Sequence, residues 1–396
     1  MHNPECGLPG LKGAATKRGI RFFGVLFAGI LWIWGACYAD SSAQKDKVSE
    51  PTAISEQVSS TWQWPVSTPD DQGLDPKKLA ELAGLIQHGE LCPQLHCLLI
   101  VRHGCLVVEE YFNGWKADGL HTLQSVTKSF TSALVGIAIA RGEFKGVDEK
   151  VLDFFPNIGE IANMDERKAS LRLEDLLTMR SGTDFHERDE GSPYRQMMRL
   201  MKGWDKFYLD RPMLQPPGTG FLYDSGGVIL ISAMLKNRTG MHAREYADRY
   251  LFKPLGIEKK FWLSNLEGHT HTGGGLALTA RDAAKFGLLY LNNGRCGNEQ
   301  VVPEEWVRES FRKRVDLAGE GQPPFGYGYL WWIFAPDPRG KTGQDIYAAR
   351  GRYGQYIIVV PEHDMVVVIY AMIQSVADQN KPTEIFYDRI LTAVRR

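Results

Sequence analysis

The chain is expected to fold as an α/β domain into which an all-α region is inserted. Runs rich in β-forming residues lie near both ends, at 98–101 and 105–110 and again at 356–360 and 365–371. Helical patterns dominate the middle, and the stretch 133–140 is apolar on every side, which is typical of a buried helix. Strands from the two ends can then share one antiparallel sheet, flanked by helices, while the central segment packs as a helical block.

Turn and capping residues set the bounds of these elements. The turn Arg102-His103-Gly104 predicts a hairpin between the first two strands. Thr279 and Asp282 form a capping pattern for a helix that reaches about residue 292, and Pro303 is expected at the first position of the next helix. The other elements expected are helices at 125–141, 173–179, 228–238 and 384–394, with a strand at 329–334.

Composition limits the class of protein. The chain has 396 residues, of which 43% are hydrophobic and 23% charged, with a net charge of −1. That balance is typical of a globular protein with a large core, and no basic stripe argues for nucleic-acid binding. Composition therefore gives no reason to expect nucleic acid as a partner.

The N-terminus has the pattern of an export signal. Four basic residues precede the uncharged apolar run 22–36, and Ala39 lies where a signal peptidase cuts. We expect residues 1–39 to be a signal peptide, 40–60 a polar linker and 61–396 one continuous domain, so that the protein acts in the periplasm or outside the cell. The alternative is an uncleaved N-terminal segment that anchors the protein in the membrane.

Ser-x-x-Lys occurs three times, but only one copy opens a buried helix. The copy at Ser42 lies in the linker, and the copy at Ser310 lies on a polar helix. Ser125 and Lys128 lie at the first turn of the apolar helix, and residues three apart share one helix face. A lysine in a poorly solvated cleft has a lowered pKa and can act as a base, so Ser125 is the candidate nucleophile.

A second segment makes a family resemblance specific. Residues 215–227, Gln-Pro-Pro-Gly-Thr-Gly-Phe-Leu-Tyr-Asp-Ser-Gly-Gly, together with Ser125 and Lys128, resemble the class C β-lactamase-related serine hydrolases. That group includes penicillin-binding-protein-like D-alanyl-D-alanine carboxypeptidases, family VIII esterases and 6-aminohexanoate-dimer hydrolases, and the last branch is the most similar. Further segments that resemble the family are 173–182, 273–282 and 326–332.

The resemblance implies a β-lactamase/transpeptidase-like fold and roles for two more residues. Tyr223 is implied as a second base or proton shuttle, with a phenol that loses its proton more easily beside the Lys128 ammonium. Ser225 is implied at the position of the family's Asn, where it hydrogen-bonds Lys128.

The third family element is a strand that carries Lys-Thr-Gly or a Gly-rich variant. A literal Lys-Thr-Gly stands at 341–343, in a polar loop, and we interpret it as unrelated to the site. The preferred region is 346–360, where Gly351-Arg352-Tyr353-Gly354-Gln355 matches a pattern of the amidase branch. By this resemblance, the N–H of Arg352, next to Gly351, joins that of Ser125 as the oxyanion hole.

These residues together predict a serine hydrolase that cleaves small amides, peptides or esters through an acyl-enzyme on Ser125, without metal or cofactor. The rival hypothesis is a non-catalytic or slowly deacylating penicillin-binding-like sensor. A zinc hydrolase that uses His269 and His271 is a weaker alternative, since a third ligand is lacking nearby. Trp331 and Trp332 are expected in the core.

Overall fold

The structure, a computed structural model, describes residues 62–187, 189–317, 326–375 and 377–395. The predicted signal peptide and linker lie outside these residues. Within them, no helix combines the length and the apolar character that crossing a membrane requires.

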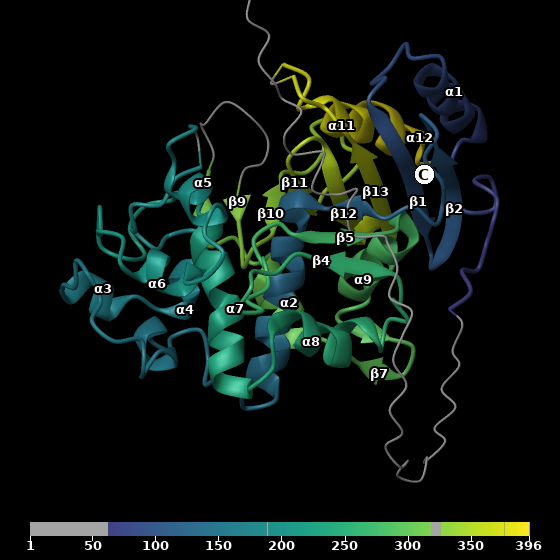
Figure 1. The fold of residues 1–396 in the computed structure, drawn as a ribbon. Helices are drawn as coiled ribbons and strands as arrows, with labels where there is room; N and C mark the ends of the chain where they lie inside the picture. The colour runs from purple at the N-terminus through teal and green to yellow at the C-terminus, as the bar shows by residue number, and fades with distance from the viewer. Residues whose placement is uncertain (1–61, 188, 318–325, 376, 396) are drawn as a thin grey trace, which may run out of the picture. The chain divides into compact units, whose positions relative to one another are not determined.

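One eight-stranded antiparallel sheet forms the centre of the described region (Figure 1). Its strands, in spatial order, are β2 (Cys105–Tyr111), β1 (Leu95–Arg102), β13 (Met365–Ala371), β12 (Gln355–Val360), β11 (Ile346–Gly351), β10 (Trp332–Phe334), β9 (Gly326–Tyr327) and β8 (Val315–Asp316). Strand β1 pairs with β13, with Leu99 opposite Val368, so the two ends of the sequence meet in the sheet as predicted. The shorter strands are β3 (His121–Thr122), β4 (Lys260–Trp262), β5 (Leu276–Leu278), β6 (Arg295–Cys296) and β7 (Glu299–Gln300).

Helices cover both faces of the sheet. On one face lie α1 (Pro76–Gln87), α11 (Lys381–Glu384) and α12 (Leu391–Ala393), the last two joined by a π-helical turn, Ile385–Ile390. The other face carries α2 (Thr127–Ala140) and α9 (Ala280–Leu291). Beyond α2 lies the helical block, with α3 (Glu166–Ser170), α4 (Leu173–Leu177), α5 (Pro193–Met198), α6 (Trp204–Leu209) and α7 (Ser225–Thr239). The remaining α-helices are α8 (Ala243–Ala247) and α10 (Glu304–Phe311).

Alternation along β13 divides the core between these two layers. Val366 and Val368 pack in the cluster that contains α2 and α9, whereas Val367 and Ile369 pack in the cluster that contains α1 and the C-terminal helices. Successive side chains of a strand point to opposite faces, so a strand covered on both faces is apolar throughout. The fold is the β-lactamase/transpeptidase-like arrangement that the family resemblance implied.

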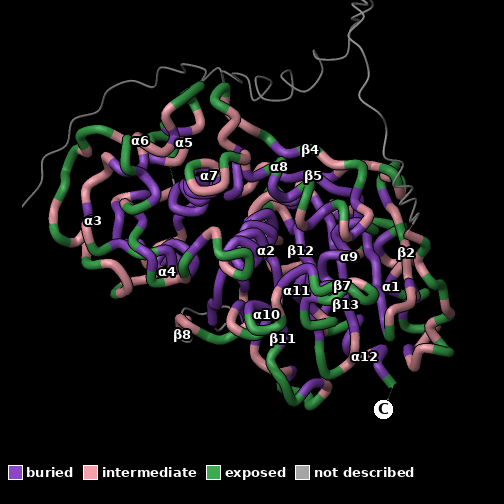
Figure 2. Tube along the Cα trace, turned by 90° about the horizontal axis from the view of Figure 1, so that it is seen from below, coloured by how far each residue is buried: buried purple, intermediate pink, exposed green. Residues whose placement is uncertain are grey.

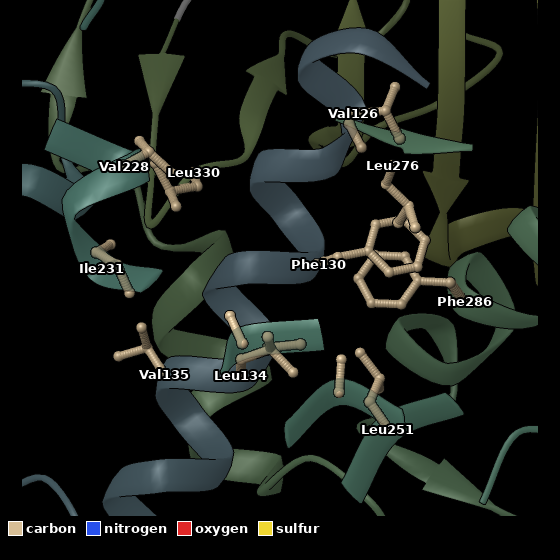
Figure 3. Packing of buried hydrophobic residues seen from close by; sticks show 14 of the residues in the cluster. Val126, Phe130, Leu134, Val135, Val228, Ile231, Leu251, Leu276, Phe286 and Leu330 are labelled. Carbon is tan, nitrogen blue, oxygen red and sulfur yellow. The ribbon is translucent and has the colours of Figure 1, made fainter. Parts of the chain in front are cut away.

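Helix α2 lies between the sheet and the helical block and is buried along nearly its whole length (Figure 2). Figure 3 shows Phe130 stacked on Phe286 of α9, and their ring centroids are 3.7 Å apart. On its other side, Val135 faces Ile231 of α7 (Figure 3). Helix α2 was expected to be buried because it is apolar on every side. It is buried, and it packs against both α9 and α7.

Most predicted elements are present, and each departure follows from specific backbone contacts. The strand expected at 329–334 is limited to β10, because Leu330 has a φ of 60° and its N–H donates to the carbonyl of Leu177. Pro303 caps α10 instead of occupying its first turn. Ser125 lies in a short 3-10 turn, Gln124–Val126, that leads directly into α2.

Replacing Phe130 by alanine tests the support that α2 gives. The change removes a fully buried ring and its stacking partner contact, so we expect Phe130→Ala to lower the free energy of unfolding by about 3–5 kcal/mol. Denaturant unfolding measures this loss. Leu266→Ala, at a side chain that is 67% exposed, is the control and should change stability little; equal losses in the two variants would contradict the packing argument.

Candidate active site

Ser125 is presented by a turn whose backbone is held in an unusual conformation. Gln124, just before it, has a φ of 49°, which non-glycine residues adopt rarely. The side chain of Gln124 donates to Thr122 Oγ1 at 3.0 Å, and Thr127 Oγ1 donates back to the Gln124 carbonyl at 2.6 Å. Such outliers persist only where neighbouring contacts impose them, and they are frequent at functional sites.

Lys128 lies one turn further along and is almost completely removed from water. Its Nζ is 3.0 Å from Ser125 Oγ and donates hydrogen bonds to Ser225 Oγ at 2.7 Å and to the Gly273 carbonyl at 2.5 Å. Only 1% of the residue is exposed. Burial lowers the pKa of Lys128 to about 8, against the opposing effect of nearby carboxylates.

Tyr223 lies against both residues, directly before α7. Lys128 Nζ is 4.8 Å from the centre of its ring, and the Ser125 side chain acts on its phenol. The ring stacks on Trp332 with centroids 5.9 Å apart. The expectation that this phenol loses its proton easily is wrong: burial, with the charge of Glu187, raises the pKa of Tyr223.

Ser225 takes the predicted place beside Lys128 because a buried carboxylate fixes the start of α7. Asp224 caps the helix by accepting the Gly227 N–H at 2.9 Å, and its other oxygen accepts the hydroxyls of Tyr208 at 2.6 Å and Ser181 at 3.0 Å. Burial raises the pKa of Asp224 to about 6. These bonds hold Tyr223 and Ser225 on either side of a fixed residue.

The end of β11 meets the turn that carries Ser125. A Cβ on Gly351 would lie 2.4 Å from the carbonyl oxygen of Leu123, so only glycine allows this approach. Gly351 and Arg352 consequently line the same cavity as Ser125, as the Gly-rich pattern predicted.

The cavity has a volume of about 500 Å³ and combines aromatic rings with charges of both signs. Its lining includes Ser125, Tyr223 and Ser225, the aromatic residues Tyr194, Trp332, Tyr353 and Tyr356, and the charged residues Glu187, Arg350 and Arg352. Lys128 lies behind this wall, in contact with Ser125 and Ser225. A site of this size and chemistry accepts a small polar molecule.

The sequence analysis missed Glu187 and misplaced Trp332. Glu187 accepts the Ser225 N–H at 2.7 Å across 38 positions of the chain, and no local pattern marks such a contact. Of the two tryptophans expected in the core, Trp331 is fully buried, whereas Trp332 faces the cavity. The one sequence signal that could have distinguished Trp331 from Trp332 is strand alternation, because successive side chains of a strand point to opposite faces.

The motifs that were set aside make structural contacts. Lys341 donates to the carbonyl of Val394, and Thr342 accepts the Asp337 N–H, so the literal Lys-Thr-Gly holds a loop. His271 is buried beside the Tyr194 hydroxyl at 3.1 Å, and burial lowers its pKa to about 4. In the part of the chain that the structure describes, no three His, Cys, Asp or Glu residues gather as a metal site.

Comparison with known proteins agrees with the geometry. The Beta-lactamase family profile matches residues 97–386. The 6-aminohexanoate-dimer hydrolase of Paenarthrobacter ureafaciens is 24% identical over 286 residues, which cover 68% of this chain and 70% of that protein. A Beta-lactamase of Escherichia coli strain K12 is 22% identical over 299 residues, covering 64% and 75%.

A solved structure shows the same fold. The D-stereospecific amidohydrolase from a Streptomyces species superposes with a TM-score of 0.62 at 15% identity, covering 77% of this chain and 97% of that one. The family profile spans well over half of the sequence and includes the Ser125 turn and its partners. The chain belongs to the beta-lactamase family of serine hydrolases.

Proposed function

We propose that the protein hydrolyses amide bonds through an acyl-enzyme on Ser125. The observation that carries this proposal is the buried Lys128 amine, 3.0 Å from the Ser125 hydroxyl at the wall of an open cavity. An amine whose pKa is near 8 is partly neutral at ordinary pH, and so it can take the proton that the nucleophile must lose.

The reaction balances with the groups present. Lys128 takes the Ser125 proton as Oγ forms a bond to the substrate carbonyl carbon, and the carbonyl oxygen becomes an oxyanion. The N–H groups of Ser125 and Arg352 are the proposed donors to that oxyanion. The carbon–nitrogen bond then breaks as a proton reaches the leaving amine, and water later cleaves the bond between Oγ and the acyl carbon.

Amides are the substrate class that the relatives support. The two relatives named for amide hydrolysis are the 6-aminohexanoate-dimer hydrolase and the D-stereospecific amidohydrolase. We propose linear amides, with esters as easier substrates and β-lactams as poor ones. The third element carries Ala348 and Ala349 where a lactamase places its lysine, and the cations that line the cavity are Arg350 and Arg352. The proposed site of action is outside the cytoplasm, on the strength of the leader pattern at 1–39.

Two substitutions test the nucleophile and the base. We expect Ser125→Ala to abolish turnover and fluorophosphonate labelling, since the attacking oxygen is lost. Lys128→Arg should lower kcat/KM at least about a hundredfold, because guanidinium stays protonated and cannot accept the proton. Both are measured on a nitrophenyl ester and a linear amide. Labelling of the alanine variant, or an active arginine variant, would reject these roles.

The rate of acylation should depend on the protonation of Lys128. Its pKa in the folded protein is about 8, and only the neutral amine accepts a proton. The labelling rate is therefore expected to rise about tenfold per pH unit below pH 8 and to level off above it. Stopped-flow labelling between pH 6 and 10 measures the curve, and a flat curve would exclude Lys128 as the base.

Gly351→Ala tests the junction between β11 and the serine turn. The added methyl group would lie 2.4 Å from the Leu123 carbonyl oxygen, so the end of β11 must move away from Ser125. We expect kcat to fall at least about tenfold, through loss of an oxyanion donor, while the thermal midpoint changes much less. Gly343→Ala, at a glycine with only ordinary contacts to Glu362, is the control. Unchanged kcat in Gly351→Ala would disprove the close fit.

A further inference from the structure

Glu187 is a charged residue of the cavity for which the proposed reaction has no task. It lies in the segment between the isolated bridge at Thr183 and α5. Among the described residues that line the cavity, it is the single carboxylate. Its Oε1 accepts the backbone N–H of Ser225 at 2.7 Å.

Ser225 connects this carboxylate to the proposed base. The N–H of Ser225 donates to Glu187, while its Oγ accepts a hydrogen bond from Lys128 Nζ at 2.7 Å. Lys128 in turn lies 3.0 Å from Ser125 Oγ. Glu187 therefore fixes the residue that orients the lysine, from a segment distant from both in sequence.

Several charged and titratable groups surround Lys128, and Glu187 is the carboxylate among them that lines the cavity. The groups that face the lysine are Tyr223 and Asp224 at the start of α7, His271 and the Gly273 carbonyl from the loop after β4, and Glu187. The charge of Arg350, on β11, also acts on Tyr223.

Asp224 and Glu187 differ in how far hydrogen bonds already occupy their oxygens. Both oxygens of Asp224 already accept hydrogen bonds from buried donors, and its pKa is raised to about 6. Glu187 opposes the effect of burial on Lys128 and adds to the effect of burial on Tyr223. Its charge therefore favours a protonated lysine and a neutral phenol.

We propose, on the basis of the function proposed above, that Glu187 is a positioning residue that holds Ser225 against Lys128 and stabilises the proton that Lys128 takes from Ser125. Tyr223 then remains a phenol and acts as a donor. The Ser125 proton passes to Lys128, the Tyr223 proton passes to the leaving nitrogen as the carbon–nitrogen bond breaks, and Lys128 returns a proton to Tyr223.

Glu187→Gln removes the charge and keeps an oxygen that can accept the Ser225 N–H. The first measurement is the titration of Lys128 by NMR in protein labelled at the lysine side chains, with Lys128→Ala used for assignment. We expect the pKa of Lys128 to fall by about one unit in Glu187→Gln, equivalent to a tenfold change in the protonation equilibrium. Glu190→Gln, at an exposed glutamate of the same segment, should leave it unchanged.

The second measurement is kcat and KM against pH on a neutral nitrophenyl ester. In Glu187→Gln, the acid limb should move to lower pH by the same amount, the plateau of kcat should fall about tenfold, and KM should stay the same. Glu187→Ala also removes the acceptor of the Ser225 N–H, so its kcat should fall further. Circular dichroism checks that each variant is folded.

Distinct results would overturn the proposal. An unchanged Lys128 titration in Glu187→Gln would show that the carboxylate does not act on the lysine. A rise in KM confined to substrates that carry an amine, with an unmoved pH profile, would make Glu187 a substrate-binding group instead. Failure of the proposed function would be visible separately, as turnover by Ser125→Ala, while the NMR titration still decides the role of Glu187.

Discussion

The enclosure of one amine is the constraint around which this protein is arranged. Lys128 is kept out of water, and an amine in that position is tolerated only if hydrogen-bond acceptors replace the lost solvent. The acceptors come from three separate stretches of chain, at Ser125, Ser225 and Gly273. Any sequence that keeps the lysine must therefore keep those stretches together, so the demands of the proposed base and of the fold coincide.

Each structural layer contributes a different part of the site. The 3-10 turn and helix α2 carry the proposed nucleophile and the proposed base, the helical block brings Tyr223 and Glu187, and the sheet brings the end of β11. The layers approach closely because small residues stand at the contacts. Gly287 of α9 has no room for a side chain against Val366, just as Gly351 has none against the serine turn. Such contacts fix the layers to within a fraction of an ångström, which catalysis requires.

Local patterns predicted much of this arrangement. The hairpin turn at His103 and Gly104, the Thr279 cap and the apolar helix all depend on neighbours in the sequence, and all are present. Ser125 and Lys128 share a helix turn, so their contact was also predictable. The contact of Glu187 with Ser225 and the interruption before β10 at Leu330 arise from distant segments. The protonation of Tyr223 was predicted in the wrong direction because burial outweighs a nearby charge only once the surroundings are known.

The pairing of β1 with β13 sets an order of events during synthesis. The partner of β1 is made more than two hundred residues later, and the end of β11 reaches the serine turn across a similar separation. Contacts this distant in sequence form slowly, since a long loop must close before they stabilise anything. A chain still emerging from the ribosome thus lacks six of the eight strands of its central sheet until residues 315–371 have been made. The cavity beside Ser125 is also incomplete until β11 has been made and has reached the serine turn, so the site can form only after most of the described chain is present.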